Sequence, residues 1–290
     1  MSSTSHDAGS VLGDVPKSRS RLRRLPGVAM VTTLVTNRRL IRQLAQRDLA
    51  ARYKGSFLGL FWAVITPLVM LSIYAFVFTV VFKAKWSADA SKTDYAFNIF
   101  AGMIVFNAFA EVMQRAPALI TSNASYVKKV VFPLEVLPVV TLYVALVQVA
   151  ISLGVLLAAW VIVHHSLSST IWLFPLALLP MCLLGLGVSW FLASLGVFIR
   201  DVTHPVLIIV QALSLLSGVF YNVANLSVKL QNVLKLNPLV VIIEDARRTL
   251  LLSQYPHWTG WLVVTGGSFV VMLLGFWWFN QTRKAFADVL

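Results

Sequence analysis

Residues 136–199 contain no Asp, Glu, Lys or Arg, and this uncharged run limits the fold more than any other feature. A hydrocarbon core of about 30 Å is crossed by roughly 20 helical residues, so the run is too long for one crossing. Polar residues at 164–170 divide it into two predicted spans. Only 12% of all residues are charged, whereas soluble proteins have about 25%. A water-soluble enzyme is therefore excluded.

Nearly uncharged runs of about this crossing length occur along the whole chain, and they predict an all-α integral membrane protein with six transmembrane helices. The spans fall at about residues 58–82, 95–115, 136–163, 171–199, 205–222 and 258–281. Of the 24 Lys and Arg residues, 17 lie on the side that holds both termini, and the positive-inside bias therefore places both termini in the cytoplasm. Residues 1–35 are predicted to form a basic, disordered cytoplasmic tail. The Ser-rich and charged composition of its first part indicates this disorder.

The charge balance and the missing motifs narrow the function. A net charge of +13 on a membrane protein favours anionic lipid headgroups or an anionic substrate over nucleic acid. The single Cys182 makes no intramolecular disulfide, and neither a metal site nor a cofactor is expected in this chain. No Gly-Lys-Ser or Gly-Lys-Thr phosphate loop occurs, and acids within the spans are rare. We therefore expect an external energy source.

Residues 36–56 have the pattern of an amphipathic helix that lies in the cytoplasmic membrane interface, with its apolar side towards the membrane. Arg47, Arg52 and Lys54 are candidates for binding a lipid phosphate or pyrophosphate, since arginine offers a bidentate fork. The spacing of four residues predicts an ion pair between Asp48 and Arg52. The alternative interpretation is a helix that only anchors the chain.

Two other features of the predicted spans are a pair of opposite charges and an abundance of aromatic residues. Glu111 and Arg115 have ion-pair spacing, and the simplest interpretation is a pair at the water boundary. The first span is rich in aromatic residues, most of which should face lipid. Alternatively, some of them line a path for sugars, whose C–H faces pack on rings. Tyr53, Trp62 and Tyr74 are the aromatic candidates for substrate binding.

Two connecting segments are predicted to form short helices. Residues 118–129 are a candidate cytoplasmic helix, although an ordinary loop with basic anchors would fit the composition. Residues 222–257 are too long for an idle outer loop. Asn237 and Pro238 read there as the N-cap and first position of a second short helix, in which Glu244 and Arg248 have ion-pair spacing. Two helices that dip into the outer leaflet and return explain the pattern; two helices resting on the outer surface are the alternative.

Three stretches of the chain resemble one known family. They are RDLAARYKGSFLGLFW at 47–62 followed by Pro67, KKVVFPLEVLP at 128–138, and SGVFY at 217–221 followed by Asn237-Pro238. This set resembles the permease subunits of type-2 ABC exporters of lipid-linked polysaccharides, the Wzm/KpsM/TagG group. The resemblance covers about residues 36–286. Any one of the stretches alone would be a weak signal.

The resemblance implies a homodimer with a channel at its interface, driven by two copies of a separate ATPase subunit that binds ATP and Mg. It implies an undecaprenyl-type lipid-linked polysaccharide as cargo and an inner-membrane location. It also implies three groups of functional residues. Lipid pyrophosphate would enter near Arg47, Arg52 and Lys54. The ATPase would contact a coupling helix at 118–129, which includes Asn123, Ser125, Tyr126 and Lys128, and a second segment with Arg200, Asp201 and His204. An outer gate at 224–252 would include Asn237, Pro238, Glu244 and Arg248, and Tyr221 precedes it.

The resulting prediction is a permease subunit that exports O-antigen or a related cell-surface glycan and is not itself an enzyme. One alternative is the same architecture with another cargo, such as teichoic acid, capsule, a drug or a lipid. A second is a membrane-embedded glycosyl transferase, against which stands the lack of an acidic pair to hold a metal and sugar nucleotide. A third is a structural scaffold, which would need neither the interfacial helix nor the outer helix pair.

Overall fold

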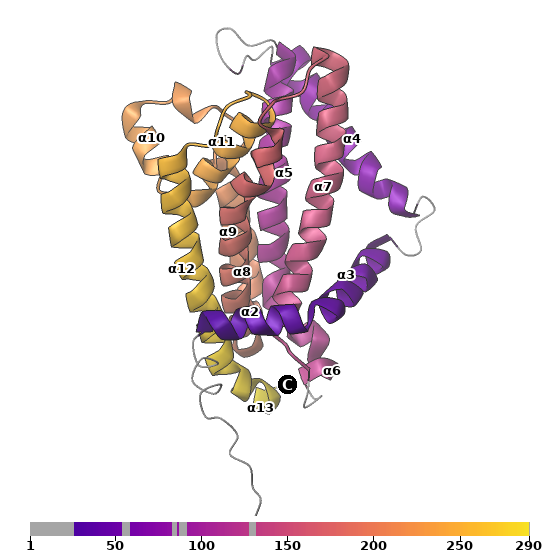
Figure 1. Cartoon of the computed structure of the whole chain (residues 1–290), viewed down its shortest axis with the longest axis vertical. Helices are drawn as coiled ribbons and strands as arrows, with labels where there is room; N and C mark the ends of the chain where they lie inside the picture. The colour runs from indigo at the N-terminus through magenta and orange to yellow at the C-terminus, as the bar shows by residue number, and fades with distance from the viewer. Residues whose placement is uncertain (1–25, 54–58, 83–85, 87–91, 128–131, 290) are drawn as a thin grey trace, which may run out of the picture.

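The computed structural model is a bundle of helices and describes residues 26–53, 59–82, 86, 92–127 and 132–289. Within these ranges every regular element is helical, in agreement with the predicted class. Figure 1 shows α2 (Pro26–Thr36) crossing one end of the bundle, where α13 (Phe286–Val289) also lies. We call this the lower end, and the opposite end, which carries α10 (Val228–Leu234), the upper end.

Five stretches are long and apolar enough to cross a membrane, and they confirm five of the six predicted spans. They are built on α4 (Trp62–Ala75) with the π-helical turn η2 (Phe76–Val81), α5 (Lys92–Arg115), α7 (Val136–His164), α8 (Phe174–Phe198) and α12 (Trp258–Thr282). Short 3-10 turns extend three of these helices: η3 (Ala116–Ala118) follows α5, η5 (Ile171–Leu173) precedes α8, and η8 (Arg283–Ala285) follows α12. Another, η1 (Gly59–Phe61), precedes α4.

The predicted fifth span differs from the structure in length. In place of a helix through residue 222, α9 (Thr203–Leu216) has 14 residues, or about 21 Å at 1.5 Å per residue. The chain turns just beyond it, where Gly218 has a φ of 66°, a conformation that glycine adopts without steric cost. At this length α9 alone is too short to cross a hydrocarbon core of about 30 Å.

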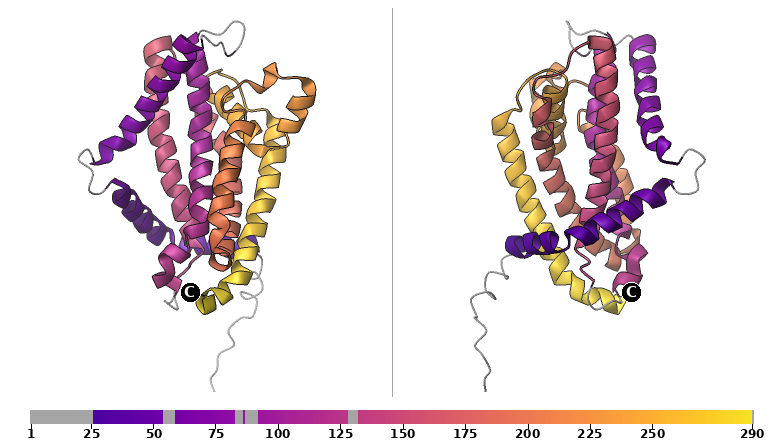
Figure 2. Two further views of the ribbon diagram at one scale, coloured as in Figure 1. Left: turned by 180° about the vertical axis from the view of Figure 1, so that it is seen from behind. Right: turned by 45° about the vertical axis from the view of Figure 1, so that its right-hand side comes forward.

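The core of the bundle surrounds α5, whose Ile99, Val105 and Val112 are completely buried. Helices α4, α7, α8, α9 and α11 (Pro238–Leu250) pack against it. The left view of Figure 2 shows α5 between α7 and α9, and the right view shows α12 beside α8. Helices α8 and α12 approach closely through Gly187 and Gly275; a Cβ at Gly275 would lie 2.0 Å from the Gly187 carbonyl oxygen. Small residues permit such contacts in membrane helix pairs.

Two helices precede the first span. Residues 26–35, which the sequence analysis placed in the tail, are part of α2, and α3 (Arg38–Tyr53) follows it. The apolar side of α3 packs through Ala45 on Val140 and Val144 of α7. This part of α3 therefore meets protein, and the predicted position of the helix in the membrane interface stays a prediction.

Two helices lie between α9 and α12, as predicted, but they differ in burial. In α10 no residue is buried, whereas Leu239, Ile243 and Leu250 of α11 are almost inaccessible. The predicted cap of α11 is confirmed: the Asn237 side chain accepts a hydrogen bond from the Leu239 amide at 3.0 Å, and Pro238 opens the helix. A short turn, η7 (Val223–Asn225), precedes α10. The interpretation of two helices resting on the surface does not fit the buried α11.

Candidate functional site

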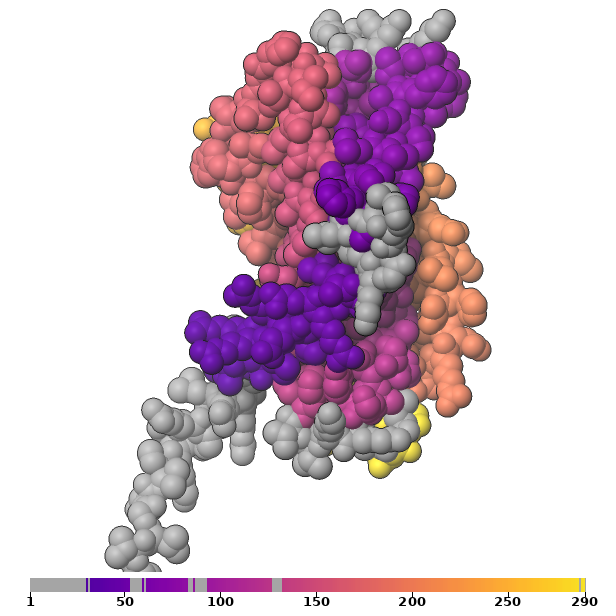
Figure 3. Space-filling model, turned by 90° about the vertical axis from the view of Figure 1, so that its right-hand side faces the viewer, coloured from indigo at the N-terminus to yellow at the C-terminus, as the bar shows by residue number. Residues whose placement is uncertain are grey.

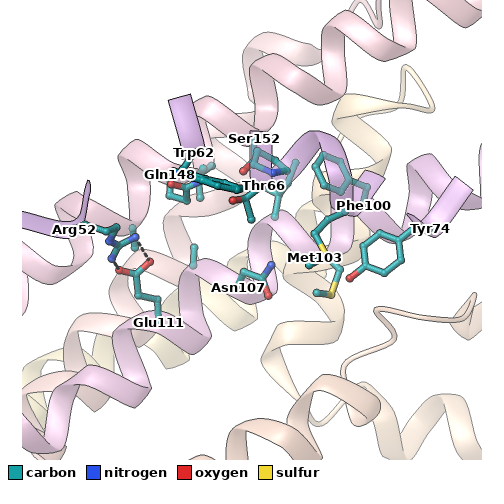
Figure 4. A pocket seen from close by; sticks show the side chains of 16 residues that line it. Arg52, Trp62, Thr66, Tyr74, Phe100, Met103, Asn107, Glu111, Gln148 and Ser152 are labelled. Carbon is teal, nitrogen blue, oxygen red and sulfur yellow. Dashed lines mark hydrogen bonds and ion pairs between the residues drawn. The ribbon is translucent and has the colours of Figure 1, made fainter. Parts of the chain in front are cut away.

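A cavity of about 480 Å³ lies between α4, α5 and α7, with Arg52 of α3 at its edge (Figure 4). Three candidate substrate residues, Arg52, Trp62 and Tyr74, line it although they come from two different helices. The other lining residues mix apolar and uncharged polar side chains: Thr66, Pro67, Met70, Phe100, Met103, Ile104, Asn107, Ala108, Ala145, Gln148, Val149 and Ser152, with Glu111 beside Arg52. Such a lining can accommodate an amphipathic molecule.

An ion pair stands at one end of this cavity. Both terminal nitrogens of Arg52 donate to the carboxylate of Glu111, as the dashed lines in Figure 4 show, while Tyr74 and Phe100 lie towards the other end. The side chains remain partly accessible, at 31% for Arg52 and 18% for Glu111. The candidate phosphate-binding arginine is therefore held by a carboxylate of α5.

Two further contacts extend this pair into a chain of charges. Arg115 lies 3.3 Å from Glu111, which confirms that predicted pair, and 2.7 Å from Asp48. The sequence analysis expected Asp48 to pair with Arg52 along α3. The structure instead directs these two side chains to Arg115 and Glu111, because α3 lies against the lower part of the bundle and brings α5 within reach. Two arginines and two carboxylates therefore alternate along this chain of charges, in the order Arg52, Glu111, Arg115 and Asp48.

The candidate substrate and coupling residues also meet each other. Arg47 Nη1 donates to the Tyr126 hydroxyl at 3.1 Å, and the Tyr126 ring stacks on Phe132 at 4.4 Å between centroids. Tyr126 belongs to α6 (Ala124–Val127), a four-residue helix. Within the predicted coupling segment 118–129, the described residues thus form the turn η4 (Thr121–Asn123) followed by α6, in place of one continuous helix. A second hollow of about 220 Å³ is lined by Arg47 of the substrate group and by Asn123 and Tyr126 of the coupling group. Asp48 and Arg115 also line it.

The remaining cytoplasmic candidates lie at the lower end. Arg200 and Asp201 are in the exposed turn η6 (Arg200–Val202), and His204 is exposed in the first turn of α9. Gly196 of α8 packs on the Pro117 backbone, which places this turn near the segment that leads to α6. Ser125 is exposed. Lys54 and Lys128 lie outside the described residues, and of Tyr53 only its place at the end of α3 is described.

At the upper end, Arg247 is a buried charged residue that was not singled out from the sequence. It is 1% exposed, and its guanidinium donates to the carbonyls of Asn98, Gly218 and Val219 at 2.7–2.9 Å. It also lies 4.5 Å from the Trp86 ring. Burial lowers the pKa of Arg247 to about 10, so it remains cationic at neutral pH. Only the position of Arg247 on the buried side of α11 could have indicated that it binds main-chain carbonyls in the interior.

The neighbours of Arg247 change the expected geometry of the outer helices. Glu244 lies 3.8 Å from Arg247, and Arg248 Nε donates to the Tyr255 carbonyl at 2.9 Å; the expected Glu244–Arg248 pair is replaced by these contacts. Asn237 binds Ser217 at 2.9 Å and so fastens α11 to the end of α9. Tyr221 is half-buried in the connection that follows α9. These candidates share the upper end but form no single cluster.

Comparison with known proteins decides the family. Residues 39–251 match the family described as "ABC-2 type transporter". The chain belongs to this family. The match runs from α3 to the end of α11 and thus includes the cavity, the chain of charges and Arg247. The protein is accordingly a membrane transport subunit.

Three relatives agree with this assignment. An "O-antigen export system permease protein RfbA" of Myxococcus xanthus is 25% identical over 90% of this chain and 99% of its own length. Two proteins of Klebsiella pneumoniae with the same name are each 24% identical over 87% of this chain and 95% of their own length. The similarity therefore extends over nearly complete chains and is not confined to one motif.

Proposed function

We propose that the chain is the permease subunit of an ATP-driven exporter that moves a lipid-linked polysaccharide, O-antigen or a related surface glycan, from cytoplasm to periplasm. The observation that carries this proposal is full-length similarity to O-antigen export permeases combined with the cavity at Arg52. Arginine suits the phosphates of an undecaprenyl-type carrier, and the rings of Trp62 and Tyr74 suit sugars. The alternative is a permease of the same architecture that exports teichoic acid, capsule or another lipid.

The energy source in this proposal is a separate ATPase subunit that holds ATP and Mg. Two segments at the lower end support the docking of this partner: α6 with the turn before it, and η6 with His204. Ser125, Arg200, Asp201 and His204 are exposed there. Because Tyr126 also holds Arg47, movement of α6 by the partner would reach the substrate-side helix α3 directly.

We also propose six crossings, with both termini in the cytoplasm of an inner-membrane protein. The long helix α8 ends at the lower end and α12 begins at the upper end, so the chain must return between them, and α9 runs in that direction (Figure 1). Helices α2 and α13 lie at the same end, as an even number of crossings requires. The connection after α9 is bound by Arg247, which suits a backbone that leaves helical form at membrane depth.

The active assembly in this proposal is a homodimer with two ATPase subunits. Its support is the large apolar surface that single protomers leave open. Leu68 and Ile73 of α4 and Ile208 and Leu215 of α9 are each at least 45% exposed. Such side chains face either lipid or a second copy, and the exposed α10 with the buried α11 would form the outer gate of the shared channel.

Copurification tests the proposal. The tagged permease is expressed with its neighbouring genes, and ATP hydrolysis is measured in whatever remains bound in nanodiscs. We expect an ATPase subunit in equimolar amount, and restored surface glycan when the genes complement an export-deficient strain. Absence of a hydrolysing partner and of surface glycan would contradict the assignment.

Tyr126→Asp tests the docking surface. The shorter, charged side chain cannot stack on Phe132, so we expect loss of the bound ATPase or at least a tenfold fall in ATP hydrolysis stimulated by substrate. Tyr255→Asp is the matched control, since Tyr255 is 60% exposed at the upper end. Unchanged copurification and turnover in Tyr126→Asp would contradict the placement of the partner.

A further inference from the structure

The Arg52–Glu111 pair occupies the place where the proposed function needs an anion. A guanidinium fork binds a carboxylate and a phosphate with the same two parallel hydrogen bonds. Glu111 already makes such a two-pronged contact with Arg52 at the edge of the cavity. A phosphate that takes the same two terminal nitrogens of Arg52 must therefore displace this carboxylate.

The surrounding charges permit that displacement. Glu111 is also within 3.3 Å of Arg115, so it keeps a cationic partner when Arg52 turns away. Arg115 is in turn held by Asp48 at 2.7 Å. The two positive charges of the arginines equal the two negative charges of the carboxylates. After the exchange Glu111 still has Arg115 as its partner, so no buried charge is left unpaired. Because the side chains of Arg52 and Glu111 are partly accessible, water screens their attraction and the pair is easily exchanged.

The cavity behind the pair favours a ligand that carries more than phosphate. Its wall combines rings and thioethers, such as Trp62, Phe100 and Met103, with the uncharged polar groups of Asn107 and Gln148. Figure 4 shows Asn107 between the ion pair and Tyr74, so polar groups continue inward from the pair. This chemistry fits a lipid phosphate whose attached chain or first sugar enters the cavity.

We propose that Glu111 is an internal counter-ion that blocks Arg52 until the phosphate of a lipid-linked substrate replaces it. The proposal rests on the proposed function and adds a residue that sets the affinity of the same site. Exchange removes the contact between Arg52 of α3 and Glu111 of α5. The contacts of Asp48 with Arg115 and of Arg47 with Tyr126 remain, and both lead towards α6. Substrate binding thereby changes how α3 is held beside the proposed ATPase contact.

The experiment measures binding of farnesyl diphosphate to the full-length permease in phosphatidylcholine nanodiscs by quenching of tryptophan fluorescence, since Trp62 lines the cavity. We expect Glu111→Gln to bind about tenfold more tightly than the wild type, because the competing negative charge is removed. Arg52→Gln should bind at least tenfold more weakly. Glu111→Ala gives the same direction as Glu111→Gln and serves as the second variant if the yield of the first is poor.

Asp288→Asn is the matched control. It removes one negative charge from the exposed helix α13, outside the charges around Arg52, and we expect an affinity within twofold of the wild type. Unchanged or weaker binding in both Glu111 variants would overturn the proposal, as would equal tightening in Asp288→Asn. Farnesol and inorganic pyrophosphate complete the test: binding as tight as that of farnesyl diphosphate by either one would overturn recognition of a lipid phosphate.

An export assay separates this inference from the proposed function. Surface glycan is measured in an export-deficient strain complemented with the wild-type genes. Tighter binding by Glu111→Gln without complementation supports the counter-ion and contradicts polysaccharide export. Complementation with no change of affinity in the Glu111 variants supports export and overturns the counter-ion.

Discussion

Arg247 donates to three main-chain carbonyls in the interior of the bundle, whereas Arg52 holds one carboxylate at the edge of a cavity. The difference follows from accessibility. A buried guanidinium must satisfy its donors within the protein, and it fixes the carbonyls that it meets. Gly102 leaves the required space, since a Cβ there would lie 2.7 Å from Arg247 Nη2. Arg247 is therefore a structural clamp, whereas the Arg52 side chain remains partly accessible.

Arg247→Met should destabilise the protein strongly. The change leaves the carbonyls of Gly218 and Val219 without their donor in a buried site, a defect that costs on the order of 3 kcal/mol. We expect a fall in the apparent Tm of about 5 °C or more in detergent, measured by thermal unfolding. Arg248→Met is the control, because Arg248 is only half-buried and its side-chain contact is exposed; its Tm should change little. Equal Tm values for the two variants would argue against the clamp.

At the scale of elements, glycine positions decide how closely α8 and α12 approach. Gly187 and Gly275 face each other with no room for a side chain, whereas a Cβ at Gly266 of the same helix α12 would meet nothing within 4 Å. Van der Waals packing drives helix association in lipid, so the loss of such a contact is not offset by the hydrophobic effect. The α8–α12 pair also carries a Ser194–Thr282 hydrogen bond at 2.6 Å.

Gly275→Leu should separate these two helices. We expect little folded protein in the membrane fraction, because the new side chain would collide with the Gly187 backbone, where nothing can move aside without shifting a helix. The paired variant Gly266→Leu adds the same side chain to the open face of α12 and should accumulate at the level of the wild type. Size-exclusion chromatography and membrane yield measure the outcome; comparable behaviour of the two variants would refute the tight contact.

For the whole molecule, the position of both ends of the described chain constrains the number of crossings. Helices α2 and α13 share the lower end, and Figure 3 shows the indigo segment α2–α3 lying across the molecule below α4. Arg283 of η8 binds Glu135 at 2.6 Å, which fastens the C-terminal segment to the start of α7. The lower end thus gathers α2 and α3, the candidate coupling segment and the C-terminal helix α13.

Cysteine labelling tests this topology. In a Cys182→Ala background, Gln254→Cys at the upper end should react with a membrane-impermeant maleimide in intact cells with a permeabilised outer membrane. Val289→Cys and Ser125→Cys, which are exposed at the lower end, should react only after the inner membrane is disrupted. Labelling of Val289→Cys and Gln254→Cys under the same condition would contradict six crossings.

The sequence predicts the helical class, five spans and the Asn237 cap correctly because these depend on local properties. Runs without charge identify a helix in lipid, and Asn before Pro identifies a helix start, whatever surrounds them. Arg52, Trp62 and Tyr74 were also chosen from the sequence, and the structure gathers them around one cavity. Their proposed binding role remains to be measured.

Pairing and burial required the tertiary structure. Spacing on a helix suggested that Asp48 binds Arg52 and Glu244 binds Arg248, but α3 lies beside α5, and α11 is buried against it, so other partners are nearer. The shortened α9 likewise follows from a turn that Arg247 binds from a distant helix. Amino-acid order fixes which segments are apolar and helical, whereas the partner of a charged side chain depends on which helices the fold brings together.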